Sequence, residues 1–154
     1  MLTVEPLSRC PALKATVSAW LLSEWPSWYG QDGPGDLVGD VDAFAQSENS
    51  LPVGFVVFKE HEPVGFRTLK QESIPSHKHL SPWAATGFVL PQYRSQGIGA
   101  FMLQAIVAYA SLLGYQQVYC GTSTATSLLQ RAGWRRLEQI NHAGKPLGIF
   151  GSGV

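Results

Sequence analysis

A glycine-containing loop between a strand pattern and a long apolar helix pattern is the feature that most constrains this fold. Residues 84–90 read as a strand that Pro91 interrupts, and apolar residues after the loop at 93–99 predict a helix that continues to Gly114. The first N–H groups of a helix have no partner within it, and the peptide dipoles place partial positive charge there. Because glycine lets an anion approach the backbone closely, this stretch predicts a phosphate or pyrophosphate site.

The glycine spacing excludes two common phosphate loops. A dinucleotide-binding loop requires a third glycine, where this chain has Met102, and a P-loop requires Lys and Ser or Thr where Ala100 and Phe101 stand. The pattern that remains is R-x-x-G-x-G/A, formed by residues 94–100. A turn that only connects the strand to the helix is the alternative interpretation of these residues.

This pattern resembles the acetyl-CoA-binding motif of the GNAT superfamily of N-acetyltransferases. The preceding strand, the following helix and the stretch Arg131-Ala132-Gly133-Trp134 extend the resemblance over the C-terminal half of the chain. The resemblance implies an α+β fold with a mixed, mostly antiparallel sheet of about six or seven strands, flanked by about four helices. It also implies a splay between the fourth and fifth strands.

Length, charge and cysteine content limit the domain number, the partners and the compartment that we expect. A chain of 154 residues fits a single domain over residues 1–154. The formal net charge is zero, so no nucleic-acid partner is expected. The N-terminus lacks a signal-peptide pattern and no apolar run reaches the roughly 20 residues that span a bilayer, so no membrane partner is expected. Cys10 and Cys120 are predicted to be reduced, buried thiols of a cytoplasmic protein.

Apolar periodicity and turn residues predict the other elements. We expect a first strand at Leu2–Pro6, a helix that Pro11 begins and Pro26 ends, and an aromatic loop over residues 25–35. The later elements are a helix capped by Asp36, a hairpin of strands at 53–58 and 64–69, a strand at 115–120, a short helix that Gly133 ends, and a hairpin over 134–150.

The resemblance also assigns the cofactor residues. The pantetheine arm of acetyl-CoA would pair with strand backbone, a mode that constrains side chains weakly, and the pyrophosphate would meet the loop, with Arg94 supplying compensating charge. The polar residue Thr122 would either contact the cofactor or cap a helix. The implied backbone contacts are Gly87, Phe88 and Val89 for the arm, and Ser95, Gln96, Gly97, Ile98, Gly99 and Ala100 for the pyrophosphate.

Acetyl transfer to an amine requires an oxyanion donor and a base. We expect the N–H of Val89 to polarise the thioester carbonyl. A lysine-like amine has a pKa of about 10.4 and must lose a proton before it attacks. Glu72 is the first candidate base, with a solvated loop carboxylate as its alternative, and His77 and His79 are second candidates. No third ligand accompanies the H-x-H pair, so no metal is predicted and both histidines are expected to be exposed.

One position departs from the GNAT pattern. Many members of the superfamily carry a tyrosine that protonates the departing thiolate, and Leu129 occupies that position here. Either water or Ser127, Thr126 or Tyr119 protonates a thiolate whose pKa resembles that of cysteine, about 8.5, or the protein binds CoA without catalysis. A plain interaction domain with a structural glycine loop is the third reading.

The acceptor is predicted to be a primary amine of a small molecule or a peptide. Trp28 and Tyr29 are expected to be exposed and to form the acceptor wall, because aromatic faces attract ammonium groups. Glu24 and Asp32 lie nearby in the sequence. The apolar helix from Ile98 is expected to be buried on most sides, covered by the sheet and the C-terminal hairpin alone or also by a second copy in a homodimer.

Overall fold

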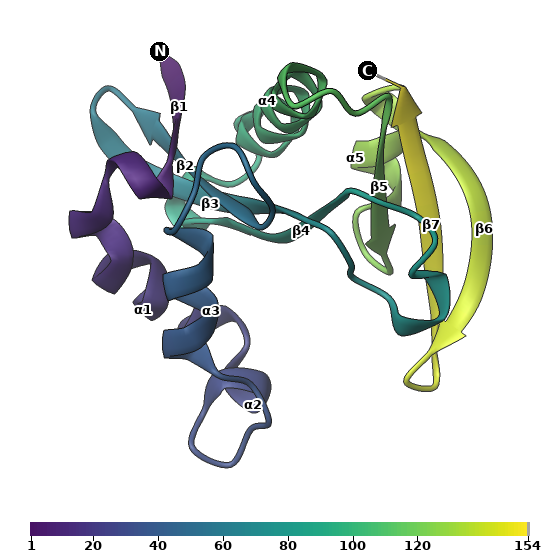
Figure 1. The fold of residues 1–154 in the computed structure, drawn as a ribbon, viewed down its shortest axis with the longest axis horizontal. Helices are drawn as coiled ribbons and strands as arrows, with labels where there is room; N and C mark the ends of the chain where they lie inside the picture. The colour runs from purple at the N-terminus through teal and green to yellow at the C-terminus, as the bar shows by residue number, and fades with distance from the viewer. Residues whose placement is uncertain (154) are drawn as a thin grey trace. The chain divides into compact units, whose positions relative to one another are not determined.

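The computed structural model describes residues 1–153, which form a seven-stranded sheet with the strand order β1-β2-β3-β4-β5-β7-β6 (Figure 1). The pairs β1–β2, β5–β7 and β6–β7 are antiparallel, and β4–β5 is parallel. The predicted α+β fold is confirmed. The strands are β1 (Leu2–Pro6), β2 (Val53–Lys59), β3 (Glu62–Lys70), β4 (Trp83–Val89), β5 (Gln117–Thr122), β6 (Arg135–His142) and β7 (Lys145–Gly153), and the α-helices are α1 (Lys14–Glu24), α2 (Pro26–Tyr29), α3 (Leu37–Phe44), α4 (Ile98–Leu112) and α5 (Thr126–Arg131).

The chain divides into two compact units, each built from two separate segments. Residues 1–68 and 86–98 form the first unit, and residues 69–85 and 99–153 form the second. Each unit has a hydrophobic cluster of its own. The expectation of one domain therefore stays a prediction.

In the first unit, helices α1 and α3 bury apolar side chains against the strands. Val17, Trp20 and Leu21 of α1 and Val41 and Phe44 of α3 are all buried in one cluster. The side chain of Asp36 caps α3 by accepting a hydrogen bond from the N–H of Gly39 at 3.0 Å, as the sequence predicts. Gly54 of β2 allows the close approach of α3, because a Cβ there would lie 2.9 Å from the Cβ of Phe44.

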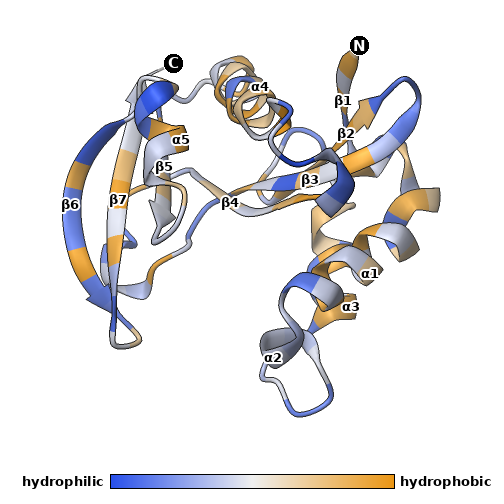
Figure 2. Ribbon diagram, turned by 180° about the vertical axis from the view of Figure 1, so that it is seen from behind, coloured by the Kyte–Doolittle hydropathy of each residue, from blue (hydrophilic) through white to orange (hydrophobic). Residues whose placement is uncertain are grey.

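The second unit is a hairpin-edged sheet covered by a loop. Ala143 and Gly144 both have positive φ, 52° and 79°, as expected of a tight turn between twisted strands, and they join β6 to β7. The loop of residues 71–82 places Ile74 in a cluster with Trp83 and Ile149. β6 lies at the edge of the sheet and its residues are almost all exposed; Figure 2 shows it largely hydrophilic.

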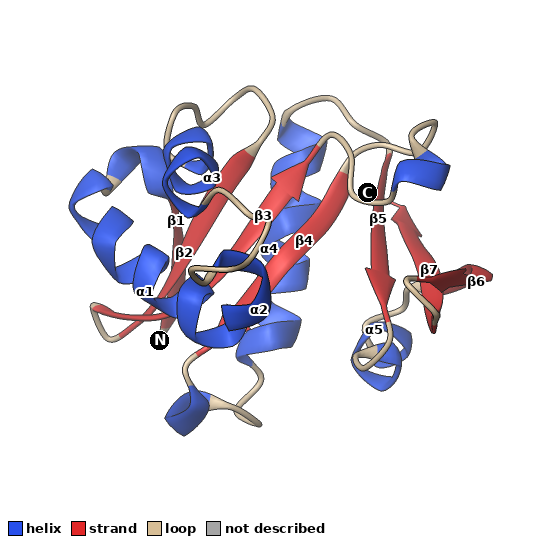
Figure 3. Cartoon of the chain, turned by 90° about the horizontal axis from the view of Figure 1, so that it is seen from below, coloured by secondary structure: helices blue, strands red, loops and turns tan. Residues whose placement is uncertain are grey.

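One prediction about the helices is wrong in detail. The segment after Pro26 begins with the four-residue helix α2 rather than with a loop (Figure 3), and Pro26 occupies its first turn. The helix α4 is buried or half-buried on most sides, as expected: its exposed residues lie along one stripe, Gln104, Ala108, Ser111 and Leu112, and the side chain of Leu112 is 83% exposed.

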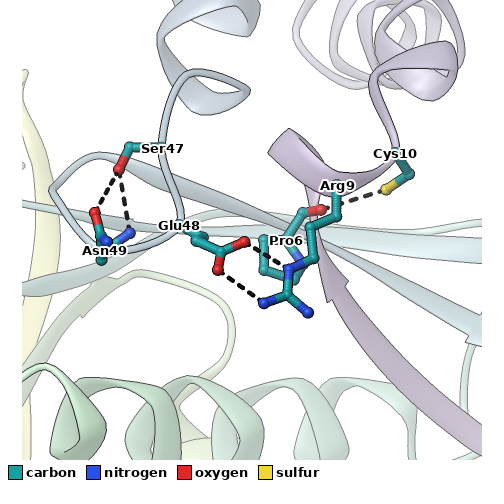
Figure 4. Close-up of polar contacts among 6 residues, drawn as sticks. All are labelled: Pro6, Arg9, Cys10, Ser47, Glu48 and Asn49. Carbon is teal, nitrogen blue, oxygen red and sulfur yellow. Dashed lines mark hydrogen bonds and ion pairs between the residues drawn. The ribbon is translucent and has the colours of Figure 1, made fainter.

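Cys10 and Cys120 are not joined in a disulfide; Cys120 is buried as predicted, whereas the prediction of burial is wrong for Cys10. Cys10 is half-buried and its Sγ contacts the carbonyl oxygen of Pro6 at 3.4 Å (Figure 4). Burial, followed by the charge of Glu5, raises the pKa of the Cys10 thiol. Within residues 1–153, no helix has the length and apolar character needed to cross a bilayer.

Candidate active site

The loop after β4 has the backbone conformation of an anion site. Ser95 and Gly97 have positive φ, 63° and 85°, whereas Gln96 between them does not. Such alternation of hand turns successive N–H groups toward one side, as in phosphate-binding nests. In the described part of the chain, the N–H groups of Ser95 and Gly97 donate to no backbone carbonyl, and Ser95, Gln96 and Gly97 are all exposed. The helix α4 begins immediately afterwards at Ile98.

Side chains of the β2–β3 hairpin hold this loop. Lys59 donates a hydrogen bond from Nζ to Oε1 of Gln96 at 2.9 Å, and its ammonium group lies 5.6 Å from the ring centroid of Tyr93. The Tyr93 hydroxyl donates to Oε2 of Glu62 at 2.8 Å. Lys59 therefore supplies positive charge beside the loop. Sequence reasoning missed it, because 37 residues separate it from Gln96 and no local motif links them.

Arg94 turns back toward β4 and α1. Its Nε donates to the carbonyl oxygen of Val89 at 2.8 Å, and its Nη2 lies 3.2 Å from Oε2 of Glu24. Its guanidinium also faces the ring of Phe88, 5.8 Å from the centroid. The charge that the sequence assigns to a pyrophosphate is thus engaged by a carboxylate of the protein.

The strand β4 carries an unusual backbone residue just before the predicted pantetheine contacts. Thr86 has a φ of 50°, which is rare for a β-branched residue and clusters at functional sites. The side chain of Phe88 is 5% exposed and stacks on Trp20 with ring centroids 5.3 Å apart. At Gly87 a Cβ would lie 2.2 Å from Nη1 of Arg67. Residues 87 and 88 therefore offer backbone rather than side chains to a ligand.

The remaining cofactor residues lie in the second unit. Trp83 of β4 pairs with Tyr119 of β5, whose N–H donates to the Pro82 carbonyl at 2.9 Å. Gly99 permits close packing of α4 on α5, because a Cβ there would lie 3.2 Å from Cδ2 of Leu128. Thr122 stabilises the turn before α5: its Oγ1 accepts from the N–H of Ala125 at 2.8 Å and from that of Thr124 at 3.2 Å, whereas no side chain caps the helix itself.

The predicted proton-transfer residues are distributed over two units. Glu72 is exposed in the loop that follows β3 and belongs to a different unit from Val89, so its role as a base stays a prediction. The expectation of two exposed histidines is wrong for His77, which is 9% exposed. Its Nδ1 lies 2.7 Å from the Ser76 hydroxyl and its Nε2 2.8 Å from Oε2 of Glu138. His79 is exposed and stacks on His77.

Two further features concern metals and the position of Leu129. No group of three potential metal ligands occurs among residues 1–153. Leu129 is 1% exposed, so the position that carries a tyrosine in many members of the superfamily is an apolar packing position here. Ser127 at the same helix is exposed.

The predicted acceptor wall is only partly exposed. The side chain of Trp28 is 51% exposed, as expected. Tyr29 is half-buried, because its hydroxyl donates to Oδ2 of Asp40 at 2.6 Å. Burial first, and then the bond to Asp40, raise the pKa of Tyr29 well above its usual value of 10.0. A separate surface depression of about 460 Å³ contains the ion pair of Lys14 and Asp42 and includes no predicted site residue.

Comparison with known protein families identifies the family of this chain. The model of a family described as an acetyltransferase (GNAT) domain matches residues 52–136, more than half of the chain. The chain therefore belongs to the GNAT family of acetyltransferases. No curated protein sequence matches this chain significantly.

Solved structures of acetyltransferases share the fold at low sequence identity. An aminoglycoside 6'-N-acetyltransferase complexed with coenzyme A superposes with a TM-score of 0.78 at 15% identity, over 98% of this chain and 96% of that chain. The aminoglycoside 6'-N-acetyltransferase from Enterococcus faecium gives 0.76 at 15% identity, with the same coverage of 98% and 96%. A putative acetyltransferase from Salmonella typhimurium, solved with its cofactor acetyl-CoA, gives 0.69 at 14% identity over 99% and 93%.

Proposed function

We propose that this protein transfers the acetyl group of acetyl-CoA to a primary amine of a small molecule or a peptide, by direct attack in a ternary complex. The observation that carries the proposal is the exposed loop at Ser95–Gly97, where the N–H groups of Ser95 and Gly97 have no backbone acceptor and the helix α4 follows. A diphosphate carries the charge and the acceptor oxygens that such a loop requires. Structural relatives solved with coenzyme A and acetyl-CoA support the choice of cofactor.

The thioester end of the cofactor lies along β4 in this proposal. The pantetheine amides pair with the backbone of residues 87–89, and the N–H of Val89 stabilises the developing oxyanion of the thioester. The left-handed residue Thr86 and the core position of Phe88 support this mode, because they leave backbone available at a distorted strand. Two cysteines far apart in the sequence and not joined in a disulfide favour a reducing compartment such as the cytoplasm.

Cofactor binding is tested by thermal unfolding with CoA. Binding at 100 times the dissociation constant stabilises the folded state by about 2.7 kcal/mol. Charge reversal in Arg94→Glu should abolish the stabilisation, whereas Arg136→Glu on the edge strand β6 makes the same charge change and should leave it intact. If CoA does not stabilise the wild-type protein, the proposal is wrong.

Catalysis is tested separately by thiol release from acetyl-CoA across a panel of amines that includes aminoglycosides and polyamines. Turnover on at least one amine is expected. The burial of Leu129 supports the second candidate, a CoA-binding module without catalysis, because no phenol occupies that position. Tight CoA binding without turnover on any amine would establish this second candidate instead.

A further inference from the structure

The guanidinium of Arg94 occupies a cation site that three groups of the first unit form. The carbonyl oxygen of Val89 accepts from Nε at 2.8 Å, and the carboxylate of Glu24 lies 3.2 Å from Nη2. The ring of Phe88 faces the guanidinium carbon at 5.8 Å, and aromatic faces attract cations. A carboxylate, a carbonyl and a ring together are what an ammonium group requires: compensating charge and hydrogen-bond acceptors.

This cation site adjoins both halves of the proposed reaction. Val89 is the residue whose backbone we assign to the thioester. Glu24 is the last residue of α1, and Trp25 connects it to α2 with the exposed ring of Trp28. A single guanidinium separates the Glu24 carboxylate from the Val89 carbonyl.

The occupant of the site is exchangeable. The side chains of Arg94 and Glu24 are 47% and 38% exposed, and ion pairs at such positions contribute little to stability. A diphosphate offers Arg94 greater negative charge and bidentate hydrogen bonds. Arg94 directly precedes Ser95, the first residue of the loop that we assign to that diphosphate.

We infer that Glu24 binds the ammonium group of the acceptor, that Arg94 fills this site while no cofactor is bound, and that the cofactor's diphosphate draws Arg94 away from it. This inference depends on the proposed function. The acceptor ammonium then donates hydrogen bonds to the Glu24 carboxylate and the Val89 carbonyl. The site therefore selects cationic primary amines, and cofactor and amine each strengthen the binding of the other by the same factor.

The first experiment measures CoA affinity by titration calorimetry in a double-mutant cycle. Glu24→Gln should bind CoA about two- to fivefold more tightly than the wild type, since Arg94 no longer has to leave an ion pair. Arg94→Gln should bind CoA more weakly, and adding Glu24→Gln to it should change nothing further. An equal effect of Glu24→Gln in both backgrounds would overturn the inference.

A matched control separates this exchange from a general charge effect. Arg9 and Glu48 form another arginine–carboxylate pair in the same unit, with contacts of 2.6 and 2.8 Å (Figure 4). Glu48→Gln removes the same charge and disrupts that pair, so it should leave CoA affinity unchanged. If it tightens CoA binding as much as Glu24→Gln does, the exchange is refuted.

The second experiment measures coupling without turnover, with CoA and the panel amine that reacts fastest with acetyl-CoA. In the wild type the amine should tighten CoA binding about fivefold or more. The coupling should disappear in Glu24→Gln and partly return in Glu24→Asp. Unaltered coupling in Glu24→Gln overturns the acceptor assignment alone, whereas absent CoA binding or absent turnover in the wild type overturns the proposed function.

Discussion

His77 Nε2 lies 2.8 Å from Oε2 of Glu138, which joins a buried side chain of the β3–β4 loop to the edge strand β6. The register of β6 on β7 shifts between Arg136 and Glu138. Such irregularities re-aim side chains at sheet edges. This hydrogen bond therefore fastens residues 71–82 to the sheet of the second unit at a point where the ladder is interrupted.

Replacing His77 should loosen this loop without unfolding the protein. In His77→Ala, trypsin should cleave after the exposed Lys78 about tenfold faster, equivalent to about 1.4 kcal/mol of local stability. His79→Ala removes an exposed neighbouring ring and should leave the cleavage rate near that of the wild type. Equal rates in the two variants would show that the pair with Glu138 does not hold the loop.

Alanine at Gly97 should impair CoA binding by more than its effect on folding. Gly97 and Gly144 have φ of 85° and 79°, and a Cβ at either position meets no atom within 4 Å. Each Gly→Ala variant should therefore lose about 1–2 kcal/mol of stability from backbone strain alone. Only Gly97→Ala should weaken CoA binding, by about tenfold, in calorimetric titration, because alanine disfavours the positive φ of the loop assigned to the diphosphate. Similar CoA affinities of Gly97→Ala and Gly144→Ala would show that the diphosphate binds elsewhere.

Removing the Tyr29 hydroxyl should cost stability that depends on alkaline pH. Tyr29→Phe loses the hydrogen bond to Asp40, worth about 1 kcal/mol. Because the pKa of Tyr29 is raised above 10.0 in the folded state, its contribution is fully present below pH 10 and declines as the pH rises further. Urea unfolding should show a wild-type advantage at pH 8 that shrinks at pH 11. An advantage that grows with pH would contradict this assignment.

The Arg9–Glu48 pair should stabilise the protein only at pH values at which Glu48 is ionised. The hydrogen bond from Arg9 holds the pKa of Glu48 below its usual value of 4.5. A carboxylate with a lowered pKa contributes above its unfolded pKa, and the contribution disappears as the pH falls through the folded pKa. Urea midpoints of Glu48→Gln should lie below those of the wild type at pH 7 and converge with them below pH 4.5. The exposed Glu72→Gln should differ at neither pH.

The local sequence pattern predicted most of the fold, because the helices and strands have regular apolar periodicity and end at recognisable turn and capping residues. Asp36 indicated a cap and Gly133 a stop, and both act as expected: Asp36 accepts from Gly39, and Gly133 has a φ of 87° after α5. The helix α2 was missed because four residues are too short for periodicity. Pro26 at its first turn was the signal that marked it.

The site was harder to predict than the fold because its side chains pair across long stretches of sequence. Glu24 and Arg94 are 70 residues apart, and His77 and Glu138 are 61 apart. The glycine loop could be recognised from its own residues, since backbone conformation is a local property. Which carboxylate an arginine or a histidine meets depends on packing, which no local motif reports.

The two units have interleaved boundaries, since the chain leaves the first at residue 68, returns at 86 and departs again after 98. A single cut in the polypeptide therefore cannot release either unit alone, because the fragment that contains one unit also carries a segment of the other. During synthesis, the first unit can be completed only after residue 98 has been translated. The second unit can be completed only when nearly the entire chain has been translated. Fragments expressed for dissection of this enzyme should accordingly be spliced from two stretches rather than truncated.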